Sequence, residues 1–180
     1  MKKIFYTDKS LYPSSETAVR EILFQYFQIP NATILRTKNG KPYLENSQKH
    51  SLFFSVTHTN EKLFIAVSNR EIGIDAEEKN REINYRAVIK KFSALEQADI
   101  QNKEDFLRLW TIKESVIKWL GGTLALDLKQ IRLERGTVFY NDAPLPVTIS
   151  TLEKDEHILN VCCETFFSDV EWIPFPTPKL

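Results

Sequence analysis

The sequence predicts a mixed α+β fold in a single globular unit. Apolar residues recur at helical spacing between residues 19 and 27, which is typical of one face of a helix. Two apolar runs of strand length, residues 52–57 and 63–68, flank the polar tripeptide Asn60-Glu61-Lys62 and indicate a hairpin. A chain of 180 residues with 42% hydrophobic residues is long enough for a substantial core.

The remaining elements follow from the same patterns. Ser14 or Ser15 can cap the first helix, Pro30 ends it, and Gly121-Gly122 ends the longest helix. The hairpin places His58 at an exposed end. The predicted strands are 4–7, 33–37, 52–57, 63–68, 71–77, 129–134, 137–141, 147–151, 157–164 and 169–173; the predicted helices are 15–29, 84–91, 94–101 and 104–120, and residues 174–180 form an extended tail.

Charge and cysteine content exclude several classes of protein. Lys plus Arg equals Asp plus Glu at 24 each, so no overall field attracts nucleic acid or an anionic membrane. Cys162 and Cys163 are adjacent in a predicted strand and would face opposite sides, which excludes a disulfide framework. No signal peptide and no membrane-spanning apolar run is evident, and we therefore expect a cytoplasmic protein.

Two acidic fragments are the strongest functional pattern. On a strand, Asp75 and Glu77 share a face, while Glu78 points away. On a helix, Glu114 and Lys118 lie one turn apart. Three carboxylates that converge suit Mg²⁺, which prefers oxygen ligands and is often shared with phosphates.

Each of these residues also has a purely structural interpretation. Asp-x-Glu at a strand end is commonly just solvated, and we favour metal ligation because the second acidic fragment accompanies it. Glu114 and Lys118 alone could form an ordinary helical ion pair, worth about 0.2 to 0.5 kcal/mol. Apolar residues on the same helix face instead place Glu114 at the edge of the core, where a carboxylate needs a partner.

Four ordered fragments carry a resemblance to a known family: Gly40-Lys41-Pro42, Ser55-Val56-Thr57-His58-Thr59, Gly73-Ile74-Asp75-Ala76-Glu77, and the run from Trp110 to Lys118. Across roughly residues 38–135 the chain resembles the 4′-phosphopantetheinyl transferases of the surfactin-synthetase-activating type. The resemblance implies a pseudo-twofold pair of similar α+β halves, each a small antiparallel sheet packed with a long helix. We expect the halves at about 1–70 and 71–173, followed by the tail at 174–180.

The resemblance also implies an activity: transfer of the 4′-phosphopantetheine arm of CoA to a serine of an apo acyl, peptidyl or aryl carrier protein, by a monomer. It implies Mg²⁺, with Mn²⁺ as an alternative, on Asp75, Glu77 and Glu114. The residues that it assigns to the CoA co-substrate are Lys41, Thr57, His58, Lys113 and Lys118, and those that it assigns to catalysis are Glu96, Glu114 and Lys118. The alternative is a non-catalytic paralogue that binds CoA or carriers.

Two points stay open at this stage. Glu96 follows Ser93 in a capping-box pattern and could close a helix N-terminus, whereas the resemblance makes it a base for the serine proton. The family's basic N-terminal segment for the adenine and 3′-phosphate of CoA has no counterpart here, since Arg20 is the only arginine before Arg36.

Overall fold

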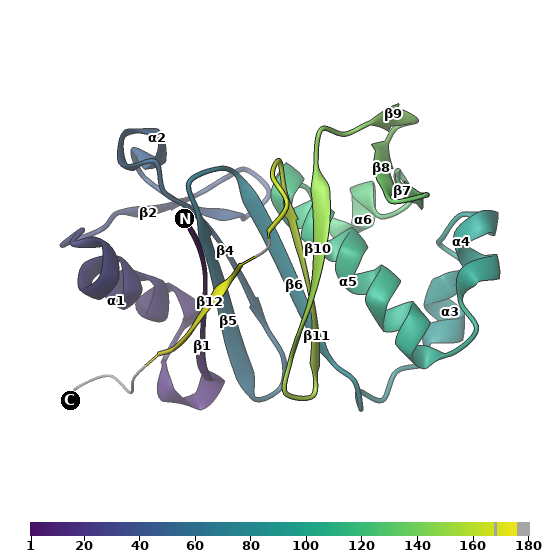
Figure 1. Ribbon diagram of the computed structural model, residues 1–180, viewed down its shortest axis with the longest axis horizontal. Helices are drawn as coiled ribbons and strands as arrows, with labels where there is room; N and C mark the ends of the chain where they lie inside the picture. The colour runs from purple at the N-terminus through teal and green to yellow at the C-terminus, as the bar shows by residue number, and fades with distance from the viewer. Residues whose placement is uncertain (168, 176–180) are drawn as a thin grey trace.

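The computed structural model describes residues 1–167 and 169–175 and shows an α+β fold. Figure 1 shows two sheets side by side in the centre, with α1 flanking one and α5 flanking the other. The elements are β1 (Lys2–Asp8), the 3₁₀ helix η1 (Lys9–Leu11), α1 (Ser15–Phe27), β2 (Ile34–Arg36), β3 (Pro42–Leu44), α2 (Ser47–His50), β4 (Phe53–His58), β5 (Lys62–Ser68), β6 (Ile72–Glu78), α3 (Tyr85–Ile89), α4 (Ala94–Asp99), α5 (Lys103–Leu120), α6 (Leu124–Asp127), β7 (Ile131–Glu134), β8 (Thr137–Tyr140), β9 (Ala143–Pro144), β10 (Thr148–Lys154), β11 (His157–Cys163) and β12 (Glu171–Pro174).

Each half of the chain contributes one sheet and one helix to the core. The first sheet has the strand order β12-β1-β5-β4, with β12 supplied by the end of the chain, and the buried face of α1, from Ala18 to Leu23, packs against Phe5, Phe54 and Ile65 of this sheet. In the second half the order is β10-β11-β6, and α5 packs across it through Phe106, Leu107 and Val116. The pseudo-twofold pair of α+β halves is therefore confirmed.

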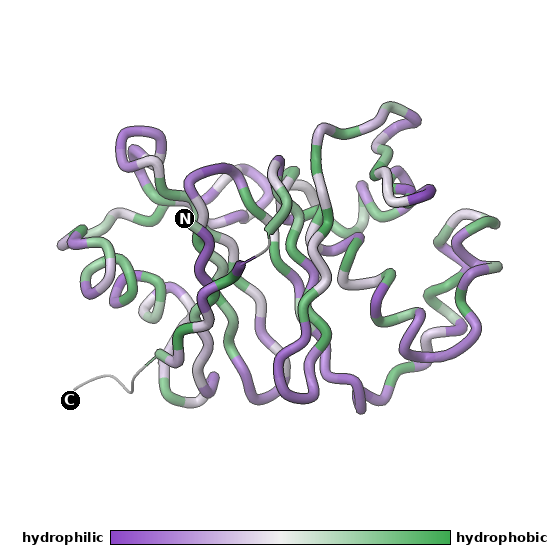
Figure 2. The backbone as a smooth tube through the Cα atoms, viewed as in Figure 1, coloured by the Kyte–Doolittle hydropathy of each residue, from purple (hydrophilic) through white to green (hydrophobic). Residues whose placement is uncertain are grey.

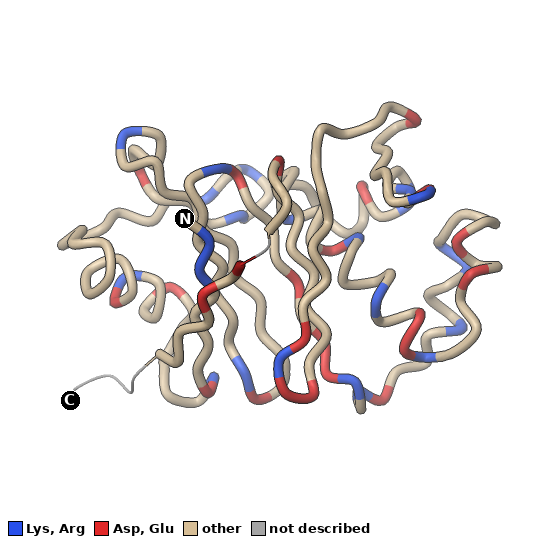
Figure 3. Tube along the Cα trace, viewed as in Figure 1, with Lys and Arg blue, Asp and Glu red and all other residues tan. Residues whose placement is uncertain are grey.

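A third apolar cluster joins the two sheets. Ile4, Phe64 and Ala66 from the first sheet meet Ile74 and Leu159 from the second. Figure 2 shows hydrophobic residues along these central strands and hydrophilic residues at the turns that join them. Figure 3 shows acidic and basic residues interspersed along the chain, as the balanced composition predicts. No helix of the described residues has the length and apolar character to cross a membrane.

Helix ends follow the predicted local chemistry. The Ser14 side chain accepts a hydrogen bond from the Thr17 amide and caps α1. Asn102 and Asp105 form a capping box at the start of α5. Gly121 ends α5 with φ +65°, a left-handed conformation that glycine adopts without a steric penalty.

Long-range pairing adds one feature that the sequence did not predict. The last strand, β12, pairs in parallel with β1, with Ile4 opposite Trp172, and so belongs to the first sheet although it ends the chain. Residues 69–71 form the loop between β5 and β6, and the junction of the two halves near residue 70 stays a prediction. Residues 176–180 of the predicted extended tail lie outside the described residues.

Close packing of α5 on β6 depends on Gly73. A Cβ built on Gly73 would lie 2.0 Å from the Ser115 carbonyl oxygen and 2.5 Å from the Trp119 amide nitrogen. Both atoms belong to the helix backbone, which cannot move aside as a flexible side chain would. The missing side chain thus allows α5 to lie directly on the strand that carries Asp75 and Glu77.

We therefore expect Gly73→Ala to lower the free energy of unfolding by about 3 kcal/mol, since it forces backbone apart in a packed core. Urea unfolding of the variant and of Gly136→Ala measures this. Gly136 has φ +81° and open space around its Cβ position, so its replacement should cost only about 1 kcal/mol of backbone strain. An equal or smaller loss for Gly73→Ala would contradict the packing argument.

Candidate active site

A cavity of about 450 Å³ between the two halves collects the predicted acidic residues. Asp75 and Glu77 reach it from the second half of β6, and Glu114 and Lys118 reach it from the facing side of α5. His58 reaches it from the end of β4. The side chains that line it come from both halves: Ser15, Arg36, Pro42, Val56, Thr57, His58, Asp75, Glu77, Arg81, Trp110, Glu114 and Lys118.

Asp75 is buried and has two donors on one oxygen. The Lys118 ammonium lies 2.7 Å from Asp75 Oδ1, and the Thr57 hydroxyl donates to the same oxygen at 2.9 Å. Thr57 is itself buried on β4, the edge strand of the first sheet. One hydrogen bond thus links the two sheets at the centre of the site, and it orients the Asp75 carboxylate.

Glu77 is the second buried carboxylate. Arg81, one short turn beyond the strand, forms an ion pair with Glu77 Oε1. Burial raises the pKa of Glu77, and the Asp75 charge raises it further, while hydrogen bonds from Arg81 and Trp110 oppose the shift. Removal of the Glu77 carboxylate from water is therefore unfavourable, and the hydrogen bonds from Arg81 and Trp110 offset only part of this effect.

Of the three carboxylates, Glu114 is the one whose charged form is most disfavoured by its surroundings. Burial, followed by repulsion from Asp75, raises the pKa of Glu114 to about 7, and Lys118 only partly offsets this. Within the described residues, no cationic side chain lies within ion-pair distance of the Glu114 carboxylate. The nearby Lys118 forms its ion pair with Asp75 instead. Glu114 is thus a half-buried acid without a partner in the cavity.

The donor set fits a hard divalent cation in its chemistry. In the described part of the chain, no group of three or more His, Cys, Asp and Glu side chains forms a ready metal cage. Lys118 and Arg81 instead bind oxygens of Asp75 and Glu77. Three carboxylates in one cavity, one of them unpaired, nevertheless provide the oxygen ligands that Mg²⁺ prefers.

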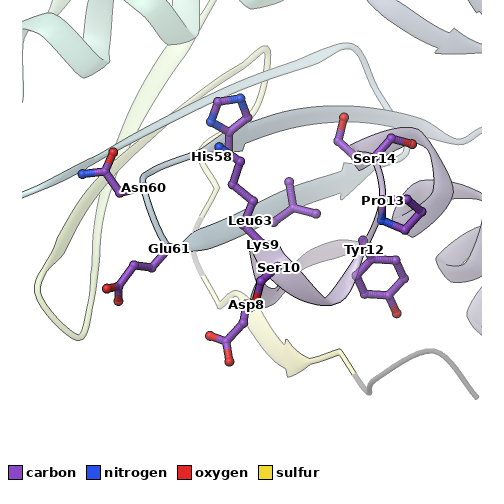
Figure 4. A pocket seen from close by; sticks show the side chains of 11 residues that line it. Asp8, Lys9, Ser10, Tyr12, Pro13, Ser14, His58, Asn60, Glu61 and Leu63 are labelled. Carbon is purple, nitrogen blue, oxygen red and sulfur yellow. The ribbon is translucent and has the colours of Figure 1, made fainter.

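His58 opens onto a second, larger cavity. This space of about 740 Å³ adjoins the first one, since Ser15 and His58 line both. Figure 4 shows the Lys9 side chain extending toward His58, with Ser14 facing them from the start of α1. The cavity is lined by Asp8, Lys9, Ser10, Tyr12, Pro13, Ser14, Ser15, His58, Asn60, Glu61 and Leu63. The exposed His58 is therefore placed where it can contact a ligand that spans both spaces.

Lys41 lies beside the site, with its ammonium already bound. It forms an ion pair with Glu71 and donates to the Trp119 carbonyl at 3.2 Å, near the C-terminal end of α5. A cation is stabilised at this end of a helix by the exposed carbonyl groups. In this structure Lys41 holds the end of α5, and any contact with phosphate would require it to leave these partners.

Glu96 and Lys113 are not brought to the cavity. Lys113 is 1% exposed, and its ammonium pairs with Glu96 at 2.9 Å on the side of α5 away from Glu114. Glu96 also accepts from the Ser93 amide at 2.9 Å, which completes the capping box of α4, and from the Leu133 amide at 3.1 Å. Of the two interpretations of Glu96, the structure shows the helix cap. Because both side chains are enclosed, neither can reach a ligand in this conformation.

Sequence reasoning missed two basic residues and one aromatic residue of the cavity. Arg81 follows Glu77 by four residues, but the pattern of the strand gives no reason to turn it back toward that carboxylate. Arg36 comes from β2 in the first half, where it donates to the Gly40 carbonyl at 3.1 Å. Trp110 begins the fourth sequence fragment, but its side chain was given no role there; it lines the cavity and hydrogen-bonds Glu77.

Comparison with known proteins places this arrangement in a family. The profile of the 4′-phosphopantetheinyl transferase superfamily matches residues 71–162, a span that contains Asp75, Glu77, Glu114 and Lys118. The chain belongs to the 4′-phosphopantetheinyl transferase superfamily. The resemblance inferred from the four sequence fragments is confirmed.

Individual relatives agree with this placement. The chain is 33% identical to the 4′-phosphopantetheinyl transferase gsp of Aneurinibacillus migulanus over 85% of its own length and 68% of that protein. It is 28% identical to the 4′-phosphopantetheinyl transferase Sfp of Bacillus subtilis (strain 168) over 78% of the chain and 67% of the relative. It is also 28% identical to the L-aminoadipate-semialdehyde dehydrogenase-phosphopantetheinyl transferase of Xenopus laevis, over 73% and 50% of the two lengths. The chain thus spans half to two thirds of the length of these relatives.

The raised pKa of Glu114 predicts a pH-dependent stability in metal-free protein. Between the ordinary value of 4.5 and about 7, the folded state binds the proton more tightly than the unfolded state does. The free energy of unfolding should therefore fall as pH rises through this window. Glu114→Gln, which cannot ionise, should escape this fall and be more stable than the wild type by about 2 kcal/mol at pH 8.

Urea unfolding in excess EDTA at intervals from pH 4.5 to 8 tests this expectation. The two proteins should be almost equally stable at pH 4.5, where folded Glu114 is protonated and about half of the unfolded chains still hold this proton, a difference of only about 0.4 kcal/mol. Curves that stay parallel over the whole range would show that Glu114 is not the strained carboxylate.

Proposed function

We propose that this protein transfers the 4′-phosphopantetheine arm of CoA to a serine hydroxyl of an apo acyl or peptidyl carrier protein and releases adenosine 3′,5′-bisphosphate. The observation that carries the proposal is the convergence of Asp75, Glu77, Glu114, Lys118 and His58 on one cavity, within a chain of this superfamily. The names of the relatives give the same activity.

Asp75, Glu77 and Glu114 are the residues that would hold Mg²⁺, or Mn²⁺ in its place. When bound, the cation would neutralise charge on the pyrophosphate of CoA and on the departing nucleotide phosphate. Burial, and after it the like charges of Asp75 and Glu77, raise the pKa of Glu114 in the metal-free protein, which supports this assignment. A cation there would relieve the repulsion.

The protein's own cations would complete the site. Lys118 projects into the cavity with 29% of its side chain exposed and can exchange its contact with Asp75 for one with a phosphate oxygen. His58, exposed at the junction of the two cavities, can donate to another phosphate oxygen. In the transfer step, the serine oxygen forms a bond to the phosphorus that bears the pantetheine arm, the bond from this phosphorus to the nucleotide breaks with its electron pair on the departing adenosine 3′,5′-bisphosphate, and the serine proton passes to water in the cavity.

The geometry changes the expected roles of four residues. Thr57 supports the site by orienting Asp75, so its proposed contact with CoA is indirect. Lys41 supports it by fixing the end of α5. Glu96 and Lys113 form a buried ion pair below α5 and are proposed only as its support. The proposed base for the serine proton is therefore not Glu96.

The proposed assembly state is a monomer in the cytoplasm. Arg36 and Thr57 from the first half and Glu114 from the second line one cavity, so a single chain supplies the whole site. Cys162 and Cys163 are both free and buried, which supports a reducing compartment.

Intact-mass analysis of an apo carrier protein incubated with this protein, CoA and Mg²⁺ tests the activity. We expect a mass gain of one phosphopantetheine arm that EDTA abolishes, and a rate at least about 100-fold lower for Asp75→Asn, because charge stabilisation by a bound cation contributes several kcal/mol. Glu78→Gln is the matched control, since Glu78 follows Glu77 but does not line this cavity.

Full activity of Asp75→Asn, or equal loss in Glu78→Gln, would contradict the assignment of the cation site. CoA binding without any transfer to several carriers would favour a non-catalytic paralogue instead.

A further inference from the structure

A buried asparagine lies next to the acidic site in the sheet. Asn160 is completely buried at the centre of β11 and stands directly opposite Asp75 on β6 and Thr151 on β10. Opposite residues of antiparallel strands project to the same face of a sheet. The three side chains therefore form a row on the face that α5 covers.

The hydrogen bonds of Asn160 have a defined direction. Thr111 on α5 donates its one hydroxyl proton to the helix carbonyls of Leu107 and Arg108, at 2.8 and 3.0 Å. The Thr111 oxygen can therefore only accept from outside the helix, and Asn160 Nδ2 donates to it at 2.7 Å. The Asn160 amide oxygen is then left to accept from the Thr151 hydroxyl, also at 2.7 Å.

The second amide proton of Asn160 reaches the Arg108 carbonyl at 3.3 Å. Every hydrogen-bonding atom of this side chain is thus engaged, two of its contacts are with α5, and one is with β10. A fully satisfied polar group in an otherwise apolar interface permits one arrangement of the helix, whereas apolar packing alone tolerates small rotations and shifts.

Asn160 contacts the same face of α5 that presents Glu114 and Lys118 to the cavity. Thr111, Glu114 and Lys118 recur at spacings of three and four residues, so they lie along one side of the helix. A rotation of α5 about its axis would move all three together. Gly73 sets how closely the helix approaches β6, but a glycine contact offers no directional bond to set its rotation.

We propose that Asn160 is a positioning residue for the acidic site: through Thr111 it fixes the rotation of α5, so that Glu114 and Lys118 face Asp75. This inference rests on the proposed function only in that it takes Asp75, Glu77 and Glu114 as the ligands of a divalent cation.

Binding of Mn²⁺ to the full-length protein, followed by electron paramagnetic resonance without CoA or carrier, is the decisive measurement. Asn160→Leu removes both bonds to α5 together with the bond to β10, and Thr111→Val removes the shorter of the two bonds to α5; each does so with little change in volume. We expect each to weaken Mn²⁺ binding about tenfold, as loss of a residue that orients metal ligands typically does. The double variant should lose no more than Asn160→Leu alone, since the bond that Thr111→Val removes is already absent from it.

Thr151→Val is the matched control, because it removes the bond from Asn160 to β10 and leaves the bonds to α5 in place. It should bind Mn²⁺ like the wild type. Wild-type affinity in Asn160→Leu, or an equal loss in Thr151→Val, would overturn the positioning role. Urea unfolding of all four variants shows whether any of them has lost its fold.

Failure of the proposed function would look different. If the wild type binds no Mn²⁺, the cation assignment is wrong, and a crystal structure of Asn160→Leu then decides the positioning role alone. Lys118 still at 2.7 Å from Asp75 in that structure would overturn it, whereas a rotated α5 with this contact broken would support it.

Discussion

The direct contact between the backbone of α5 and strand β6 is the constraint on which the site depends. With no side chain at Gly73, the helix backbone lies where a Cβ atom would otherwise be. Asp75 lies two residues further along the same face of the strand, and Lys118, in the turn of the helix that approaches Gly73, has its ammonium 2.7 Å from Asp75. This close approach brings Glu114 near Asp75, and repulsion between the two carboxylates adds to burial in raising the pKa of Glu114.

The cost of this arrangement is electrostatic. Three carboxylates share a partly buried cavity, and the two nearby cations, Lys118 and Arg81, pair with Asp75 and Glu77. Within the part of the chain that the structure describes, Glu114 has no such ion pair, and its surroundings therefore disfavour its charged form. A protein selected only for stability would gain by replacing such a residue with an uncharged one of similar size. The presence of Glu114 beside two other carboxylates is understandable if a bound cation balances their charge.

Local pattern predicted much of the fold and of the site, because short-range chemistry decides both. Helical spacing and the Ser14 cap identified α1, and strand alternation put Asp75 and Glu77 on one face. The three lysines show where such reasoning stops. Lys41, Lys113 and Lys118 carry the same charge, yet only Lys118 opens into the acidic cavity. Lys113 forms a buried ion pair with Glu96. Lys41 forms an ion pair with Glu71 and donates a hydrogen bond to a carbonyl at the end of α5. These partners are distant in sequence, as is the pairing of β12 with β1, and no local pattern specifies them.

The junction between the two sheets explains why a site can exist there. β4 and β6 are the facing edges of the two sheets, and in the described residues no ladder of backbone hydrogen bonds joins them. Side chains provide the connection instead: the Ser55 hydroxyl accepts from the Ile74 amide at 3.1 Å, and the Thr57 hydroxyl donates to Asp75. A continuous ladder of backbone hydrogen bonds between β4 and β6 would have left no space between the two strands. Because the sheets meet through hydroxyl groups, the strands can diverge beyond Thr57 and Asp75, and the cavity between His58, Glu77 and Glu114 lies in that opening.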